Sequence, residues 1–454
     1  MRRGLLAALA VTVALGVAAA KDPKKKEVET LYEEFRGLTK ERKWAKACGV
    51  LRRIGKLGTG LAVRVVIGAA VRYPERADIT AAARETLEKM ETEDACKALS
   101  AAAGSFRDWR GRLLALEALI YRRHPVVVPT IRECLRDRKP QVVRAAIRGV
   151  LAAGAVELIG ETIALVERLE KERGLVWLDA VRALATLLNA EAKDAEGWRA
   201  LYEAKKAEME EQKKRGEYTP HEDKGMTVVA KVAREAPKFF GAEIVSNRVI
   251  FVIDCSSSMQ ARDPEMVRTP DGRMTLKRKL PKGAAPDQWG GFPSLPADRA
   301  RMERVKRELA RCIKSLPRAA KFNVISFAGD VKRWRGGLVR ATDGNKASAV
   351  AWVRGIRAKG DTHTDDALKE AFADAEVDTI YLLSDGQPWK DGCPLDVDSI
   401  LKWVADENRF RRITIHTFGF EFARKAPTLH LADMMRFLKG LAEQNRGRFT
   451  NIYW

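Results

Sequence analysis

Short apolar runs alternate with helical patterns from residue 248 onward, and this alternation most constrains the fold. The first run, residues 248–253, is a nearly continuous series of β-branched and aromatic residues, as expected for a strand buried on both faces. Similar runs follow at 322–327, 379–383 and 413–418, with helical patterns at 302–315, 347–357, 364–375, 400–408 and 431–444. The pattern predicts an α/β fold with a Rossmann-like, doubly wound, mostly parallel sheet over residues 241–454.

The N-terminal part, residues 21–215, carries apolar positions three and four apart and very little strand-like alternation. A motif of small residues beside branched apolar ones recurs after 31 and then 34 positions, at 115–119, 146–150 and 180–184. Residues 137–147, with Pro140 suited to the first turn of a helix, resemble the second helix of a HEAT repeat. We therefore expect an N-terminal all-α, HEAT-like helical domain, with a non-repetitive bundle as the alternative. A linker is expected at residues 216–240.

The first twenty residues have the composition of a secretory signal peptide. Arg2 and Arg3 precede an apolar run at residues 5–17, which ends in three alanines. We expect residues 1–20 to direct export to a periplasmic, cell-surface or secreted location, with an uncleaved anchor as the alternative. No later segment offers about 20 uninterrupted apolar residues, so we expect that the chain is not a transmembrane protein.

The formal net charge of +22 is compatible with a polyanion-binding surface. The other interpretation is a soluble protein with a basic face, and the sequence favours it. Export argues against a nucleic-acid role, and no basic-aromatic recognition motif is present, so we expect no nucleic-acid partner.

Oxygen-bearing side chains follow the predicted strands at their carboxyl ends, where parallel sheets bind ligands. Asp254, Ser256 and Ser258 form a D-x-S-x-S pattern directly after the first strand. Thr362 precedes a helical pattern, and Asp385 follows the strand predicted at 379–383. These three loops, in this order, resemble the metal-ion-dependent adhesion site (MIDAS) of the von Willebrand factor A (VWA) domain family.

The resemblance implies a VWA fold and a Mg²⁺ ion held by Asp254, Ser256, Ser258, Thr362 and Asp385, although Mn²⁺ or Ca²⁺ would also suit oxygen ligands. It implies that both aspartates act mostly through bound water. One coordination position is then left for an acidic side chain of a protein partner. We therefore expect a binding module and not an enzyme, with the helical domain as a second interaction surface.

Two features depart from the family pattern. Asp361 stands where the family usually has a small residue before the metal-binding threonine. The connection at 260–298 is long and rich in Arg, Lys, Pro and Gly, so it either helps to choose the partner or is a mobile surface insertion.

Two other function classes stay open. A basic scaffold would bind a polyanion without metal, and its binding would collapse with added salt. A hydrolase would use Ser256 or Ser258 with His363 and an aspartate, but the chain has neither a G-x-S-x-G elbow nor an HExxH helix.

Overall fold

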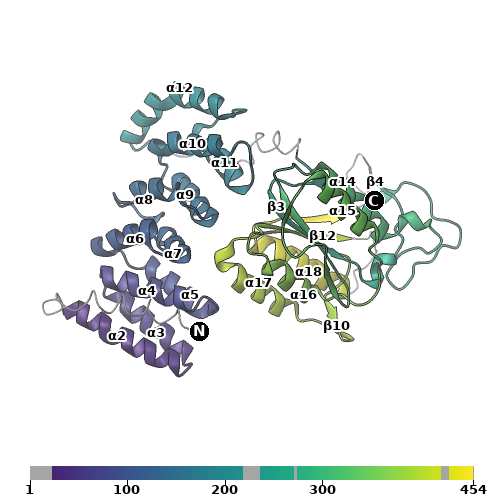
Figure 1. The fold of residues 1–454 in the computed structure, drawn as a ribbon, viewed down its shortest axis with the longest axis horizontal. Coiled ribbons are helices and arrows are strands. Elements are labelled where there is room, and N and C mark those ends of the chain that lie inside the picture. Colours follow the sequence, from purple (N-terminus) through teal and green to yellow (C-terminus); the bar gives the residue numbers. More distant parts are fainter. Residues whose placement is uncertain (1–22, 218–235, 270–273, 421–428, 453–454) are drawn as a thin grey trace. The chain divides into compact units, whose positions relative to one another are not determined.

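The computed structural model describes residues 23–217, 236–269, 274–420 and 429–452, and the chain divides into a helical unit and an α/β unit (Figure 1). The signal peptide predicted at residues 1–20 and most of the predicted linker lie outside the described residues. Among the described residues, no helix is long and apolar enough to cross a membrane.

The N-terminal unit is all-α, as predicted. Its helices are α2 (Pro23–Lys40), α3 (Trp44–Lys56), α4 (Gly60–Arg72), α5 (Ala77–Glu88), α6 (Glu93–Ser105), α7 (Trp109–Leu119), α8 (Val127–Cys134), α9 (Pro140–Ala152), α10 (Ile159–Leu169), α11 (Leu175–Leu188) and α12 (Ala195–Lys214). Helices α3, α5, α7 and α9 pack in succession, and so do α4, α6 and α8. The unit is thus a two-layered stack (Figure 1), and its HEAT-like nature stays a prediction.

Contacts between successive helix pairs recur at nearly the period found in the sequence. The Arg52 guanidinium lies 3.0 Å from a Glu85 carboxylate oxygen, 33 positions later. Glu117 accepts hydrogen bonds from Arg84, 33 positions earlier, and from Arg148, 31 positions later. One face of the stack therefore carries arginines that are already paired with acidic residues.

The α/β unit contains a seven-stranded sheet in the order β13-β12-β9-β3-β6-β7, with β8 also paired to β6. The strands are β3 (Arg248–Asp254), β6 (Lys321–Phe327), β7 (Val331–Arg333), β8 (Val339–Arg340), β9 (Thr379–Ser384), β12 (Thr414–Phe420) and β13 (Phe449–Ile452). The five strands from β13 to β6 pair in parallel, whereas β7 and β8 are antiparallel to β6. The sheet is therefore mostly parallel, as the sequence predicts.

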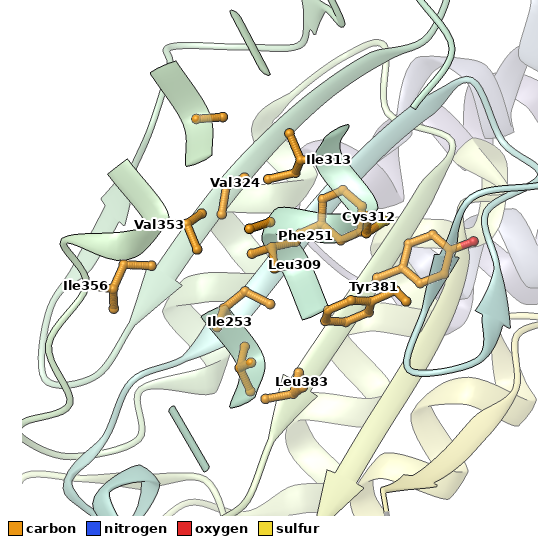
Figure 2. Packing of buried hydrophobic residues seen from close by; sticks show 14 of the residues in the cluster. Phe251, Ile253, Leu309, Cys312, Ile313, Val324, Val353, Ile356, Tyr381 and Leu383 are labelled. Carbon is orange, nitrogen blue, oxygen red and sulfur yellow. The ribbon is translucent and has the colours of Figure 1, made fainter. Parts of the chain in front are cut away.

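Helices cover both faces of this sheet. On one face, α14 (Arg301–Ser315) and α15 (Asp343–Arg354) pack over residues such as Phe251 and Tyr381 (Figure 2). On the other face, α16 (Thr364–Ala373), α17 (Val397–Arg411) and α18 (Leu429–Gln444) pack over Ile250 and Val252. Because β3 alternates its side chains between two apolar cores, it requires the continuous hydrophobic run seen in the sequence.

The predicted α/β elements are all present, with ends that differ by up to about four residues. Three two-stranded ribbons were not predicted: β1 (Lys238–Phe239) with β2 (Ala242–Glu243), β4 (Met266–Arg268) with β5 (Met274–Leu276), and β10 (Trp389–Lys390) with β11 (Cys393–Pro394). Phe239 belongs to the sequence predicted as linker, yet its ring packs on Phe251 and Phe418 in the core.

Candidate metal centre

The sheet brings the first and third loops together at its carboxyl edge. Strand β3 ends at Asp254 and strand β9 ends at Ser384, and the two strands pair in parallel, with Ile253 opposite Leu383. The Ser384 hydroxyl donates a 2.5 Å hydrogen bond to Asp254 Oδ2, and the Ser256 amide donates a 2.8 Å bond to Oδ1. Asp254 is completely buried, so these bonds fix the orientation of its carboxylate.

The two serine hydroxyls of the first loop face each other beside the third loop. Ser256 Oγ and Ser258 Oγ are 3.0 Å apart, and the Ser258 hydroxyl donates a 2.6 Å hydrogen bond to Asp385 Oδ1. Because its proton is engaged by the carboxylate, Ser258 keeps oxygen lone pairs available for a cation.

Hydrogen bonds of the backbone and of the Ser257 side chain hold the second loop in place. Ser257 N donates to the Gly360 carbonyl at 3.0 Å, and Gly360 N donates back to Ser257 Oγ at 3.0 Å. Gly360 has a φ of +98° and a Cβ there would lie 3.2 Å from the Gly329 amide, so glycine suits this approach. On the other side, Thr362 N donates to the Trp389 carbonyl at 3.1 Å and Trp389 N donates back at 3.0 Å.

Gly386 marks the place where hydroxyls from the first and second loops converge. A Cβ built on this glycine would lie 3.6 Å from Thr362 Oγ1 and 3.8 Å from Ser258 Oγ. The side chains predicted from separate parts of the sequence therefore gather around one point, beside the backbone that follows Asp385.

Burial makes the negative charge at this point costly. It raises the pKa of Asp254 to about 7, and the neighbouring Asp385 carboxylate adds to the increase, although hydrogen bonds from Ser256 and Ser384 oppose it. A cation near Asp254 would therefore stabilise the charged form of its carboxylate.

One cation is provided by Arg301, at the start of α14, which the sequence analysis did not single out. Its side chain is 1% exposed. Nη1 lies 2.6 Å from Asp385 Oδ2, and Nε lies 3.0 Å from Asp263 Oδ2. Burial alone would lower the pKa of Arg301, but these two carboxylates outweigh it and raise that pKa. The two buried carboxylates of Asp263 and Asp385 therefore share this guanidinium, and the positive charges of Arg299 and Arg304 also act on Asp263.

The hydroxyl oxygens would suit a hard divalent cation in spacing and in chemistry. Neighbouring ligands of an octahedral Mg²⁺ are about 3.0 Å apart when each oxygen lies about 2.1 Å from the metal. The separation of Ser256 Oγ and Ser258 Oγ agrees with this value. Among the described residues, no group of three or more His, Cys, Asp or Glu side chains is placed to hold a metal. The candidate donors here are instead hydroxyls beside two carboxylates.

The neighbouring charged residues have other partners. Lys369 and Lys390 hold the Asp366 carboxylate, and although burial acts in the opposite direction, their hydrogen bonds lower its pKa to about 2. Each ring nitrogen of His363 lies 3.9 Å from a carboxylate oxygen, of Asp361 or Asp366. His363 therefore faces the acids of its own loop and helix, whereas the Ser258 hydroxyl is directed to Asp385.

These features define a class of protein domain, an α/β domain with a hydroxyl-rich site at the carboxyl edge of its sheet. Residues 297–449 match the family model described as von Willebrand factor type A domain, and this part of the chain is a VWA domain. The match begins after the D-x-S-x-S loop. Strand β3 nevertheless lies at the centre of the same sheet, so the folded domain extends back to include this loop.

Three relatives match part of the chain. Over 153 residues the chain is 34% identical to von Willebrand factor A domain-containing protein 3B of Homo sapiens. The aligned residues make up 33% of this chain and 11% of that protein. Protein 3A of the same name and organism is 31% identical over 150 residues, 33% of this chain and 12% of that protein. Inter alpha-trypsin inhibitor, heavy chain 4 of Mus musculus is 30% identical over 100 residues, 19% of this chain and 11% of that protein. The chain thus spans about a tenth of the length of these relatives.

Solved structures are similar over about half of the chain. A von Willebrand factor type A protein from Catenulispora acidiphila has 18% identity and a TM-score of 0.32, covering 47% of this chain and 40% of that one. The PilB minor pilin from Streptococcus sanguinis has 13% identity and a TM-score of 0.31, covering 47% of this chain and 59% of that one.

Proposed function

We propose that this chain is an exported, non-enzymatic protein-binding module that captures an acidic group of a protein partner through a Mg²⁺ ion. Asp254, Ser256, Ser258, Thr362 and Asp385 would hold the ion, and Mn²⁺ or Ca²⁺ would be accepted in its place. The VWA domain itself supports the general role of an interaction module. The ion would supply an electrophilic position for the partner's carboxylate. The five residues would orient the ion, and the two aspartates would balance its charge.

One observation carries the proposal: oxygen donors from three separate loops converge beside the buried carboxylates of Asp254 and Asp385, which repel each other. Ser258 Oγ is 3.0 Å from Ser256 Oγ and lies with Thr362 Oγ1 around the same position beside Gly386. A divalent ion beside Asp254 and Asp385 would offset the repulsion between their two carboxylates. Hydroxyl ligands are neutral, so the ion would keep enough positive charge to attract a further carboxylate.

The helical unit is proposed as a second interaction surface. Its stacked layers form an extended surface of the kind that helical repeats use for binding. Arginines on this unit already pair with acids, as Arg84 and Arg148 do with Glu117. Those pairs favour a protein partner over a polyanion, because a polyanion would have to displace the carboxylates.

The test is calorimetric titration of Mg²⁺ and Mn²⁺ into the full chain, followed by binding of an acidic peptide to the metal-loaded protein. Asp254→Ala, Ser256→Ala should lose both signals. A matched control, Asp343→Ala, Ser348→Ala, changes the same residue types on α15 and should keep them. Metal and peptide binding that survive in the first variant would refute the proposal.

The competing functions give different signals in the same experiments. Polyanion binding would resist a chelator and weaken steeply with salt, whereas capture through the metal should vanish with the chelator. Hydrolysis of generic esters or peptides that is lost in Ser256→Ala would support the hydrolase. The contacts of His363 with Asp361 and Asp366 argue against that alternative.

A further inference from the structure

The side chain of Arg301 joins the candidate metal centre to the long connection at residues 260–298. Its guanidinium contacts Asp385 Oδ2 at 2.6 Å on the metal side. On the other side it contacts Asp263 Oδ2 at 3.0 Å and the Trp289 carbonyl oxygen at 3.1 Å, both within that connection. Asp263 and Arg301 are each 1% exposed, so solvent screens these charges very little.

The part of the connection that meets Arg301 is an ordered structure. The Asp263 amide donates to the Arg299 carbonyl at 3.2 Å, and the Phe292 amide donates to the Arg262 carbonyl at 2.7 Å. Gly291 packs so closely that a Cβ there would lie 2.5 Å from the Arg262 amide nitrogen. This backbone holds Asp263 and the Trp289 carbonyl in fixed positions around the guanidinium.

We propose that Arg301 is a positioning residue that orients Asp385 and makes the metal affinity of the site depend on Asp263 of the connection. This inference rests on the metal binding proposed above. Asp263 shares the guanidinium charge with Asp385. Without Asp263, more of the guanidinium charge would act at the metal site, where it would repel an incoming cation and compete for Asp385.

A double-mutant cycle tests this dependence in the full chain, with Mn²⁺ as the probe. Asp263→Asn should weaken Mn²⁺ binding about tenfold in the parent chain and change it less than about twofold in an Arg301→Gln background. The control is Glu265→Gln, which removes a charge from the same connection but contacts Lys277. It should leave the affinity unchanged. If Asp263→Asn lowered the Mn²⁺ affinity equally in both backgrounds, the charge of Asp263 would act on the metal without Arg301. That result would overturn the proposal.

A second measurement needs no metal and so separates this inference from the proposed function. Hydrogen exchange followed by mass spectrometry, in chelator, should show faster exchange in Arg301→Gln both at residues 287–292 and at residues 385–390. Arg307→Gln is the matched control, because Arg307 on the same helix contacts the connection at the Asp298 carbonyl, 3.1 Å away. It should leave residues 385–390 unchanged.

The outcomes are distinct. A parent chain that binds no Mn²⁺ but shows the paired exchange response would refute the proposed metal function and keep Arg301 as the positioning residue of Asp385. Unchanged exchange at residues 385–390 in Arg301→Gln would overturn the role of Arg301, whatever the metal affinity.

Discussion

Protons and metal ions should compete at Asp254. Burial beside Asp385 raises the pKa of Asp254 to about 7 in the metal-free protein, and a cation at the site requires the charged carboxylate. A group with this pKa is mostly protonated at pH 6 and mostly charged at pH 8. The apparent affinity for Mg²⁺ should therefore be about tenfold weaker at pH 6 than at pH 8, because nine tenths of the sites must first lose a proton.

The same shift fixes the sign of the stability change in the absence of metal. The folded pKa lies above the ordinary value of 3.8, so protonated Asp254 contributes stability below about pH 4 that is lost as the pH rises through 7. The loss is on the order of 4 kcal/mol at most. Mg²⁺ should restore stability mainly above pH 7, where it takes the place of the proton.

Calorimetric titration at pH 6, 7 and 8, with thermal unfolding in chelator at the same values, measures both effects. Asp254→Asn should bind Mg²⁺ weakly and with little dependence on pH in this range. Imidazoles ordinarily titrate in the same range, so His363→Gln is the control and should keep the dependence. An affinity in the parent chain that is equal at pH 6 and pH 8 would refute the reasoning.

Three further predictions concern single side chains. Thr362→Val should reduce Mg²⁺ affinity about tenfold or more in calorimetry. Thr364→Val, whose hydroxyl donates a 3.4 Å hydrogen bond to the Thr362 carbonyl, should keep the affinity. Glu117→Gln should destabilise the helical unit by about 1–3 kcal/mol in urea unfolding because two arginines lose their charged partner, while Glu34→Gln, at an exposed pair, should cost less than about 1 kcal/mol. Phe251→Ala should destabilise the α/β unit by about 3–5 kcal/mol, because it leaves a cavity in the core. Tyr381→Phe loses only the hydrogen bond to the Glu243 carbonyl and should cost about 1 kcal/mol. Equal losses of unfolding free energy in these two variants would contradict the packing described.

The sequence was sufficient to predict the central strands and the convergence of three loops. The run at β3 is buried on both faces, so its composition alone distinguishes it from the half-exposed strands at the sheet edge. The carboxyl ends of parallel strands share an edge, so Asp254 and Asp385 could be placed together although they are far apart in the chain. The edge strand β13 was missed because Phe449–Ile452 is short and mostly half-exposed, with no apolar run to mark it.

Arg301 and Asp263 could not be found from the sequence for a different reason. They are 38 positions apart, and the intervening connection gives no periodic pattern that would place one against the other. In sequence, Arg301 looks like any basic residue at the start of a surface helix. Only the folded connection reveals that its guanidinium is buried between two carboxylates. The short ribbons were missed similarly, because strands of two or three residues carry too little pattern.

The most direct test of the central claim is a crystal structure of the full chain grown or soaked with Mn²⁺ and measured at the manganese absorption edge. We expect an anomalous peak about 2 Å from the hydroxyl oxygens of Ser256, Ser258 and Thr362. The peak should disappear in an Asp254→Ala, Ser256→Ala crystal. An ordered parent structure in which these three hydroxyls surround no anomalous peak at saturating Mn²⁺ would contradict the claim that this edge of the sheet is a metal centre.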